Sequence, residues 1–131
     1  MTHTEEGVLA AAEHLVDAFG RHDAEAYFAA FAPDASFIFH NLDRVLKSRA
    51  EYEQEWKVWE RRDGFRVLGC RSSERAVQMS GHVAVFTHVV ETDISLGGER
   101  LTNRERETVV FGLGPEGQWL AFHEHLSALP G

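Results

Sequence analysis

The chain has 131 residues, of which 44% are hydrophobic and 26% charged, as expected for one globular domain. We therefore expect a single domain over residues 1–131. Its 13 basic and 21 acidic residues give a net charge of -8 at pH 7. A surface with this charge lacks the positive patch that binds phosphates, so nucleic acid and anionic membrane are not expected partners.

The N-terminal segment and the single cysteine bear on the compartment. The first twenty residues carry Glu5, Glu6 and Glu13 where a signal peptide would have a basic region followed by an apolar one. Cys70 has no second cysteine with which to form a disulfide within the chain. No apolar run reaches the roughly 18 residues that span a membrane. These features predict a cytoplasmic protein.

The first third of the chain predicts two helices in a hairpin. Apolar residues recur at three- and four-residue steps between Val8 and Phe19, and Thr4 is a candidate N-cap. A shorter helix is predicted from Asp23, as its cap, until Pro33.

One strand and a third helix follow. The segment "ASFIFH" (35–40) is rich in aromatic and β-branched residues, which favours a strand. Ser48 and Glu51 form an S-x-x-E capping box that predicts the start of a helix, and Gly64 predicts its end. One face of this helix carries three large aromatic residues: Tyr52, Trp56 and Trp59.

After Gly64 the hydrophobic period changes to two, which predicts four consecutive antiparallel strands. They are expected near residues 65–79, 82–95, 99–112 and 118–127. Helices followed by such a meander indicate an α+β domain. Several of these strands are apolar on both faces, so we also predict a homodimer through the outer face of the sheet.

The last predicted strand has two faces, and the sequence does not decide which one looks inward. With strict alternation, one face holds Trp119, Ala121, His123, His125 and Ser127. The other face then holds Leu120, Phe122, Glu124 and Leu126.

This order of elements resembles the NTF2-like cone fold, a group that includes SnoaL-like cyclases and ketosteroid isomerases. The segment "RETVVFGLGPEGQWLAFHEHLS" (106–127) is similar to the R-x-T-x-V, G-x-W and H-x-H-x-S pattern of SnoaL-like and calcium/calmodulin-dependent kinase association-domain sequences. The segment "DAEAYFAAFAPDASF" (23–37) is similar to their second helix and first strand. The resemblance implies an α+β, NTF2-like (cystatin-like) cone with three N-terminal helices packed on a strongly curved, mainly antiparallel sheet.

His123 and His125 share one strand face, and three roles are considered for them. They could bind a metal ion if His88 or His40 supplied a third ligand, but no H-E-x-x-H motif or cysteine pair accompanies them. One of them could act as a general acid or base, because the imidazole pKa lies near neutrality. They could also be structural or line the edge of a pocket. We expect no metal and no cofactor.

Other candidate site residues follow from polarity. Arg106 or Asn41 could stabilise a developing oxyanion, although a cross-strand ion pair of Arg106 with Glu91 or Glu107 is the favoured interpretation of the arginine. Trp56 and Trp119 are core residues or pocket walls, which are one surface in a cone fold. The predicted catalytic residues are therefore His123, His125 and Arg106. The predicted substrate-binding residues are His40, Asn41, Trp56, His88 and Trp119.

The resemblance and the site residues together predict a SnoaL-like small-molecule pocket protein. If it is an enzyme, the expected chemistry is proton transfer, as in an isomerase, cyclase or dehydratase, on a small hydrophobic carbonyl compound. The alternative is a non-catalytic ligand-binding or oligomerisation module of the kinase association-domain type. The expected partners are a small hydrophobic ligand and a second copy of the chain.

Overall fold

The protein is described by a computed structural model over residues 4–130. The elements in chain order are α1 (Glu5–Gly20), α2 (Ala24–Ala29), β1 (Phe31–Phe39), α3 (Arg49–Asp63), β2 (Arg66–Ser80), β3 (Val83–Leu96), β4 (Glu99–Leu113) and β5 (Trp119–Ala128). The strands form one sheet in the order β1-β5-β4-β3-β2. All neighbours in the sheet are antiparallel except β1 and β5, which are parallel. None of the helices within residues 4–130 is long and apolar enough to cross a membrane.

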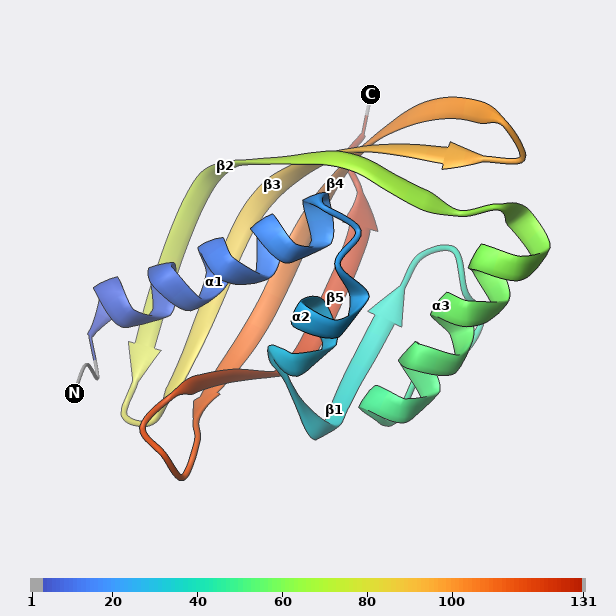
Figure 1. The fold of residues 1–131 in the computed structure, drawn as a ribbon. Helices are drawn as coiled ribbons and strands as arrows, with labels where there is room; N and C mark the ends of the chain where they lie inside the picture. The colour runs from blue at the N-terminus through green and yellow to red at the C-terminus, as the bar shows by residue number, and fades with distance from the viewer. Residues whose placement is uncertain (1–3, 131) are drawn as a thin grey trace.

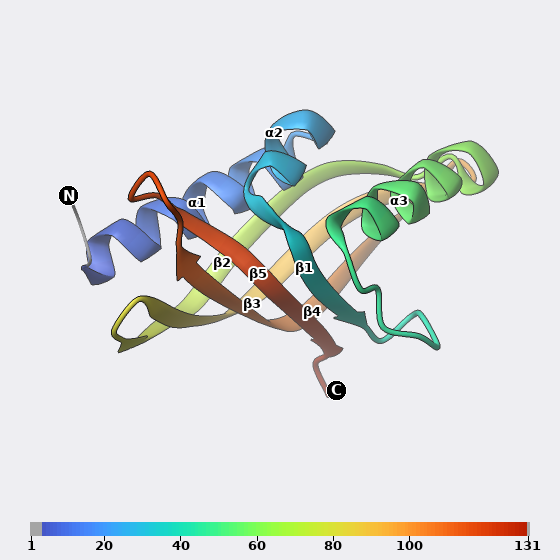
Figure 2. The same cartoon turned by 90° about the horizontal axis from the view of Figure 1, so that it is seen from below.

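The sheet curves, and the three helices lie on its concave side (Figures 1 and 2). Helix α1 runs across β2 and β3, whereas α3 lies beside β1 at the other side of the molecule. This arrangement confirms the predicted α+β fold with a curved sheet. The expected group of three N-terminal helices is matched only in part, because α3 follows β1 in the chain.

The helix ends are set by the side chains that the sequence indicates. The Thr4 hydroxyl accepts a hydrogen bond from the Gly7 N–H at 3.3 Å and caps α1. At α3 the Ser48 hydroxyl accepts from the Glu51 N–H at 3.1 Å, and the Glu51 carboxylate accepts from the Lys47 N–H at 3.1 Å. Gly64 ends α3 in the left-handed conformation, with φ of 60°.

The boundary between α2 and β1 differs from the predicted one. Helix α2 ends at Ala29 and β1 starts at Phe31, so Pro33 lies inside the strand instead of terminating the helix. Proline is tolerated there because β1 is an edge strand and its pairing with β5 is irregular between Phe31 and Ser36.

Strand β5 contains an extra residue that changes which side chains face the helices. Val110 pairs with His123 and Phe111 pairs with Ala121, so Phe122 has no partner on β4. The bulge shifts the alternation by one residue. Strict alternation along this strand is therefore wrong: the inward side chains are Trp119 and Ala121 before the bulge, and Glu124 and Leu126 after it.

The space between helices and sheet is filled mainly by aromatic rings. Tyr52 packs against Phe37 with ring centroids 4.6 Å apart, and Tyr27 packs edge-on against Phe31 at 5.2 Å. Trp56 is 1% exposed and contacts both tyrosines. This packing holds the two tyrosine rings in fixed positions, with their hydroxyl groups directed toward the sheet.

Loss of the α3 cap tests this account of the helix that carries Tyr52. We expect Ser48→Ala to lower the free energy of unfolding by about 1 kcal/mol, because the Glu51 N–H loses its acceptor. Ser48→Asp should restore most of the loss. Urea denaturation followed by circular dichroism measures both, with Ser73→Ala on the exposed face of β2 as the control. Equal stability of Ser48→Ala and the unaltered protein would contradict the assigned cap.

Candidate functional site

A cavity of about 580 Å³ opens between α3, the segment after β1 and the inner face of the sheet. Its volume is that of a site for a small organic molecule. Its apolar wall is formed by Phe19, Phe39, Leu42, Trp59, Phe65, Ile94, Leu96, Leu101 and Leu126. The polar side chains His40, Asn41, Thr92, Asn103 and Glu105 also line it, as do the ion pairs Arg44–Glu55 and Arg62–Asp63.

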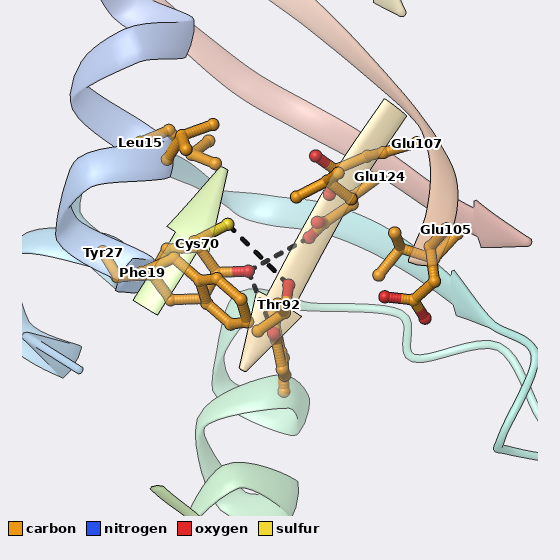
Figure 3. A pocket seen from close by; sticks show the side chains of 12 residues that line it. Leu15, Phe19, Tyr27, Cys70, Thr92, Glu105, Glu107 and Glu124 are labelled. Atoms are coloured by element: carbon orange, nitrogen blue, oxygen red, sulfur yellow. Dashed lines mark hydrogen bonds between the residues drawn. The ribbon is translucent and has the colours of Figure 1, made fainter. Parts of the chain in front are cut away.

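A second chamber, of about 40 Å³, adjoins this cavity deeper in the fold (Figure 3). The cavity and the chamber share five lining residues: Phe19, Tyr52, Thr92, Glu105 and Leu126. The chamber is too small for a whole ligand but has room for one functional group of a ligand held in the larger cavity. Its deepest polar groups are therefore those that a bound molecule would meet.

Two carboxyl groups lie together at the chamber, Glu107 from β4 and Glu124 from β5 (Figure 3). They are 5% and 2% exposed. Burial raises the pKa of Glu124 well above its ordinary value, and the neighbouring Glu107 raises it further. Burial also raises the pKa of Glu107, but the hydrogen bond from Glu124 opposes that shift. The pair consequently holds one proton near neutral pH, carried by Glu124, which donates to Glu107.

Two tyrosine hydroxyls extend the network from Glu124 to the cavity wall. Tyr27 donates to Glu124 Oε1 at 3.3 Å, and the hydroxyls of Tyr27 and Tyr52 are 2.9 Å apart. Burial raises the pKa of both phenols well above the ordinary value, so both are protonated. Because Tyr27 uses its one hydrogen toward Glu124, Tyr52 donates to Tyr27.

His88, from β3, contacts Glu107 from the side opposite Glu124. Its Nε2 lies 2.5 Å from Glu107 Oε1, and its Nδ1 lies 2.6 Å from the Ser72 hydroxyl. Burial lowers the pKa of His88 to about 4, so the ring is neutral at pH 7. Nε2–H therefore donates to the Glu107 carboxylate, and Nδ1 accepts from Ser72.

The predicted histidine pair lies outside both spaces. The bulge at Phe122 turns His123 and His125 to the convex face of the sheet, and neither lines the cavity or the chamber. His123 Nδ1 is 2.8 Å from the Ser36 hydroxyl of β1, and the two imidazole centroids are 6.4 Å apart. Among residues 4–130, no group of three histidine, cysteine or acidic side chains is arranged to hold a metal ion.

Arg106 also points away from the cavity. It is exposed on the convex face, where its neighbour Arg104 forms an ion pair with Glu91 at 2.9 Å. The structure therefore does not bring Arg106 together with the buried carboxyl groups.

The predicted substrate-binding residues fall into three groups. His40 and Asn41 line the cavity, and His40 Nε2 is 2.6 Å from Glu105 Oε2. Trp56 and Trp119 are core residues, 1% and 7% exposed, and the Trp56 indole N–H donates to Glu60 at 3.0 Å. The remaining predicted residue, His88, belongs to the buried hydrogen-bond network and does not line the cavity.

The sequence did not single out Glu124, and Glu107 was considered as an ion-pair partner of Arg106. The sequence feature that could have identified Glu107 and Glu124 is a charged residue among apolar residues on one face of a predicted strand. Glu124 stands between Phe122 and Leu126, and on β4 Glu107 precedes the inward Val109. Acidic residues are rarely buried without partners, so a glutamate at such a position indicates a neighbour that shares its proton or pairs its charge.

The fold is shared with solved structures at low sequence identity. The chain has a TM-score of 0.82 and 18% identity to the ketosteroid isomerase-like protein from Erwinia carotovora atroseptica, covering 100% of both chains. The NTF2-like protein from Cytophaga hutchinsonii gives 0.81 and 16%, covering 98% of this chain and 100% of that one. The CaMKII hub of S. rosetta gives 0.77 and 20%, with 98% and 99% covered. These likenesses define an NTF2-like fold.

The family follows from the sequence itself. The family model described as the SnoaL-like domain matches residues 8–130, and the chain belongs to this family. No curated protein sequence matches the chain at a significant level.

The raised pKa of Glu124 predicts how stability depends on pH. Because this pKa is raised in the folded protein, folded Glu124 keeps its proton at pH values where the unfolded chain, with a carboxyl pKa near 4.5, has released it. Glu124 should therefore lower the free energy of unfolding as the pH rises from 6.5 to 8.5, by at most about 1.4 kcal/mol per unit. Near pH 6.5 the unfolded chain still titrates histidine, and near pH 8.5 it begins to titrate Cys70, so both groups contribute to the slope. These contributions are the same in variants that differ only at Glu124, so the difference in slope reports Glu124.

Urea denaturation at several pH values in this window measures the slope. Glu124→Gln should reduce it, because the amide carries no titratable proton. Glu99→Gln, at an exposed position of β4, is the matched control and should retain it. Equal slopes in Glu124→Gln and in the unaltered protein would show that Glu124 is ionised in the folded protein.

Proposed function

We propose that the cavity binds a small hydrophobic carbonyl compound and that Glu107 and Glu124 move a proton on it. The observation that carries this proposal is the one-proton carboxyl pair at the inner end of an apolar cavity. Two adjacent carboxyl groups with a single proton supply a base and an acid at the same pH. The apolar walls favour a ligand with little polarity outside its reacting group.

The protonation states of Glu107 and Glu124 decide which of them is the base and which is the acid. The Glu107 carboxylate takes a proton from the carbon next to the carbonyl, and the electron pair moves to the carbonyl oxygen. Once Glu107 has taken this proton, it no longer needs the hydrogen bond from Glu124, and the Glu124 O–H can donate to the developing negative charge in the chamber. Return of the proton from Glu107 to another carbon completes an isomerisation. If a β-hydroxyl takes that proton instead and leaves as water, the reaction is a dehydration.

The fold comparisons support a pocket of this kind without assigning its reaction. One structural neighbour is named ketosteroid isomerase-like, and another is a kinase hub, so the same fold carries more than one role. The preference for proton transfer comes from the buried carboxyl pair, which a purely structural cone does not need.

A simple β,γ-unsaturated ketone, 3-cyclohexenone, tests this activity. We expect the protein to accelerate its conversion to the conjugated enone, which is followed by ultraviolet absorbance. Glu107→Gln should lower the rate constant by about 10² or more, because a positioned general base contributes at least this factor. Glu99→Gln, His123→Ala and His125→Ala should leave it unchanged, since none of them lines the cavity.

The outcomes separate catalysis from simple binding. Unchanged turnover in a folded Glu107→Gln variant would refute the assigned base, and loss of turnover in His123→Ala would favour the histidine pair. If the ketone quenches Trp59 fluorescence but is not converted, the non-catalytic ligand-binding alternative holds, because Trp59 lines the cavity.

We also propose that the protein forms a homodimer through the convex face of the sheet. Phe122 and Val83 are 37% and 38% exposed there, which is unusual for large apolar side chains. The Phe122 ring lies over Gly112, where a Cβ would come within 3.2 Å of the ring, and Gly112 pairs with Val83. The three residues thus form a continuous apolar surface of the kind that a partner covers.

Light scattering after gel filtration tests the dimer. Phe122→Glu should convert a dimer to a monomer, because a carboxylate in the interface would be desolvated. Val45→Glu, at an exposed apolar residue away from this face, is the control and should stay dimeric. A Phe122→Glu variant with the mass of the unaltered protein would contradict this interface.

A further inference from the structure

The buried carboxyl pair is connected on one side to a residue at the edge of the sheet. Ser72 contacts His88, His88 contacts Glu107, and each contact is short, at 2.6 and 2.5 Å. His88 is fully buried, whereas Ser72 is half-buried and lies on β2, the edge strand. These two hydrogen bonds run from Glu107, on its side away from Glu124, to Ser72 at the edge of the sheet.

We propose that His88 and Ser72 form a proton path that exchanges the proton of the Glu107–Glu124 pair with solvent at the β2 edge. The path differs from the route through the cavity, which a bound ligand would fill. Its use during turnover rests on the proposed function, but the path itself requires only the buried pair and the two hydrogen bonds.

The orientation of each hydrogen bond is suited to a relay. Ser72 donates to His88 Nδ1, and His88 Nε2–H donates to Glu107, so both hydrogens point toward the carboxylate. In one passage Ser72 gains a proton from water and gives its own to Nδ1, while Nε2 gives its proton to Glu107. Solvent loses one proton, Glu107 gains one, and His88 changes tautomer. The reverse passage returns the proton to solvent and restores the first tautomer.

The sheet is locally opened next to His88. Val89 pairs with Ser73 and Thr87 pairs with Ala76, so the two intervening residues of β2 bulge out opposite His88. One of them, Glu74, has φ of 51°, which is an uncommon conformation for a side chain of this kind. The regular ladder of β2 is thus interrupted where the path reaches the surface.

Burial keeps the His88 ring neutral although it contacts the Glu107 carboxylate. Burial lowers the His88 pKa most, and Arg75, the other bulge residue, lowers it further. Arg75 lies 4.0 Å from Glu13 of α1. A neutral imidazole with one N–H and one acceptor nitrogen is the form that passes a proton without holding it.

Infrared spectroscopy tests the path on the folded protein without any ligand. The C=O stretch of a protonated carboxyl group shifts when its hydrogen is replaced by deuterium, and Glu124→Gln assigns this band. After mixing with D₂O, we expect Ser72→Ala and His88→Gln to slow the shift by about tenfold or more, since each removes one link of the relay. His88→Gln still offers an amide N–H to Glu107, so a purely structural role would be largely preserved.

Two variants complete the design. Ser72→Thr keeps a hydroxyl at the same position and should exchange at the rate of the unaltered protein. Ser73→Ala removes a neighbouring exposed hydroxyl that has no part in the path and should also leave the rate unchanged.

The outcomes of this experiment are distinct from those of the turnover test. Exchange in Ser72→Ala and His88→Gln at the unaltered rate overturns the path, because the proton then leaves through the cavity. Absence of a protonated carboxyl band in the unaltered protein overturns it as well. Slow exchange in both variants supports the path even if no ketone is isomerised, and in that case only the proposed function fails.

Discussion

One additional residue in β5 determines what the inner face of the sheet carries. Without the bulge at Phe122, the alternation of β5 would turn Glu124 to the convex face and His123 toward the helices. With it, Glu124 lies beside Glu107 of β4, and the polar network of the core is centred on two carboxyl groups. The same bulge turns His123 and His125 to the convex face, so a single register shift shapes both surfaces of the sheet.

Burying two carboxyl groups side by side is unfavourable unless their charge is reduced and their oxygens are bonded. The protein meets both conditions, because the pair keeps one proton and receives hydrogen bonds from Tyr27 and His88. Among residues 4–130, no buried side-chain nitrogen or oxygen lacks a hydrogen-bond partner. The densely packed aromatic rings behind the tyrosines supply the apolar burial that offsets the remaining cost.

The sequence predicted the elements that depend on local signals. The Thr4 and Ser48 caps and the period-two strands after Gly64 are found close to the expected residues. It failed where the outcome depends on a long-range pairing. Nothing local in "WLAFHEHLSA" indicates that Phe122 is skipped by β4, and that skip reverses the side of every later residue in the strand. The candidate site depended on that register, so the histidines were favoured over the glutamates.

The chamber also contains a thiol, and the protonation state of this thiol limits the chemistry that the site supports. Cys70 lines the chamber beside Thr92, and burial raises its pKa to about 11. The thiolate is the nucleophilic form of cysteine, so at neutral pH this side chain is inert. The phenols of Tyr27 and Tyr52 are likewise fixed as donors by burial. Glu107 and Glu124 then remain as the adjacent base and acid of the chamber, which is why the chemistry proposed for this cavity is proton transfer between carboxyl groups and a ligand.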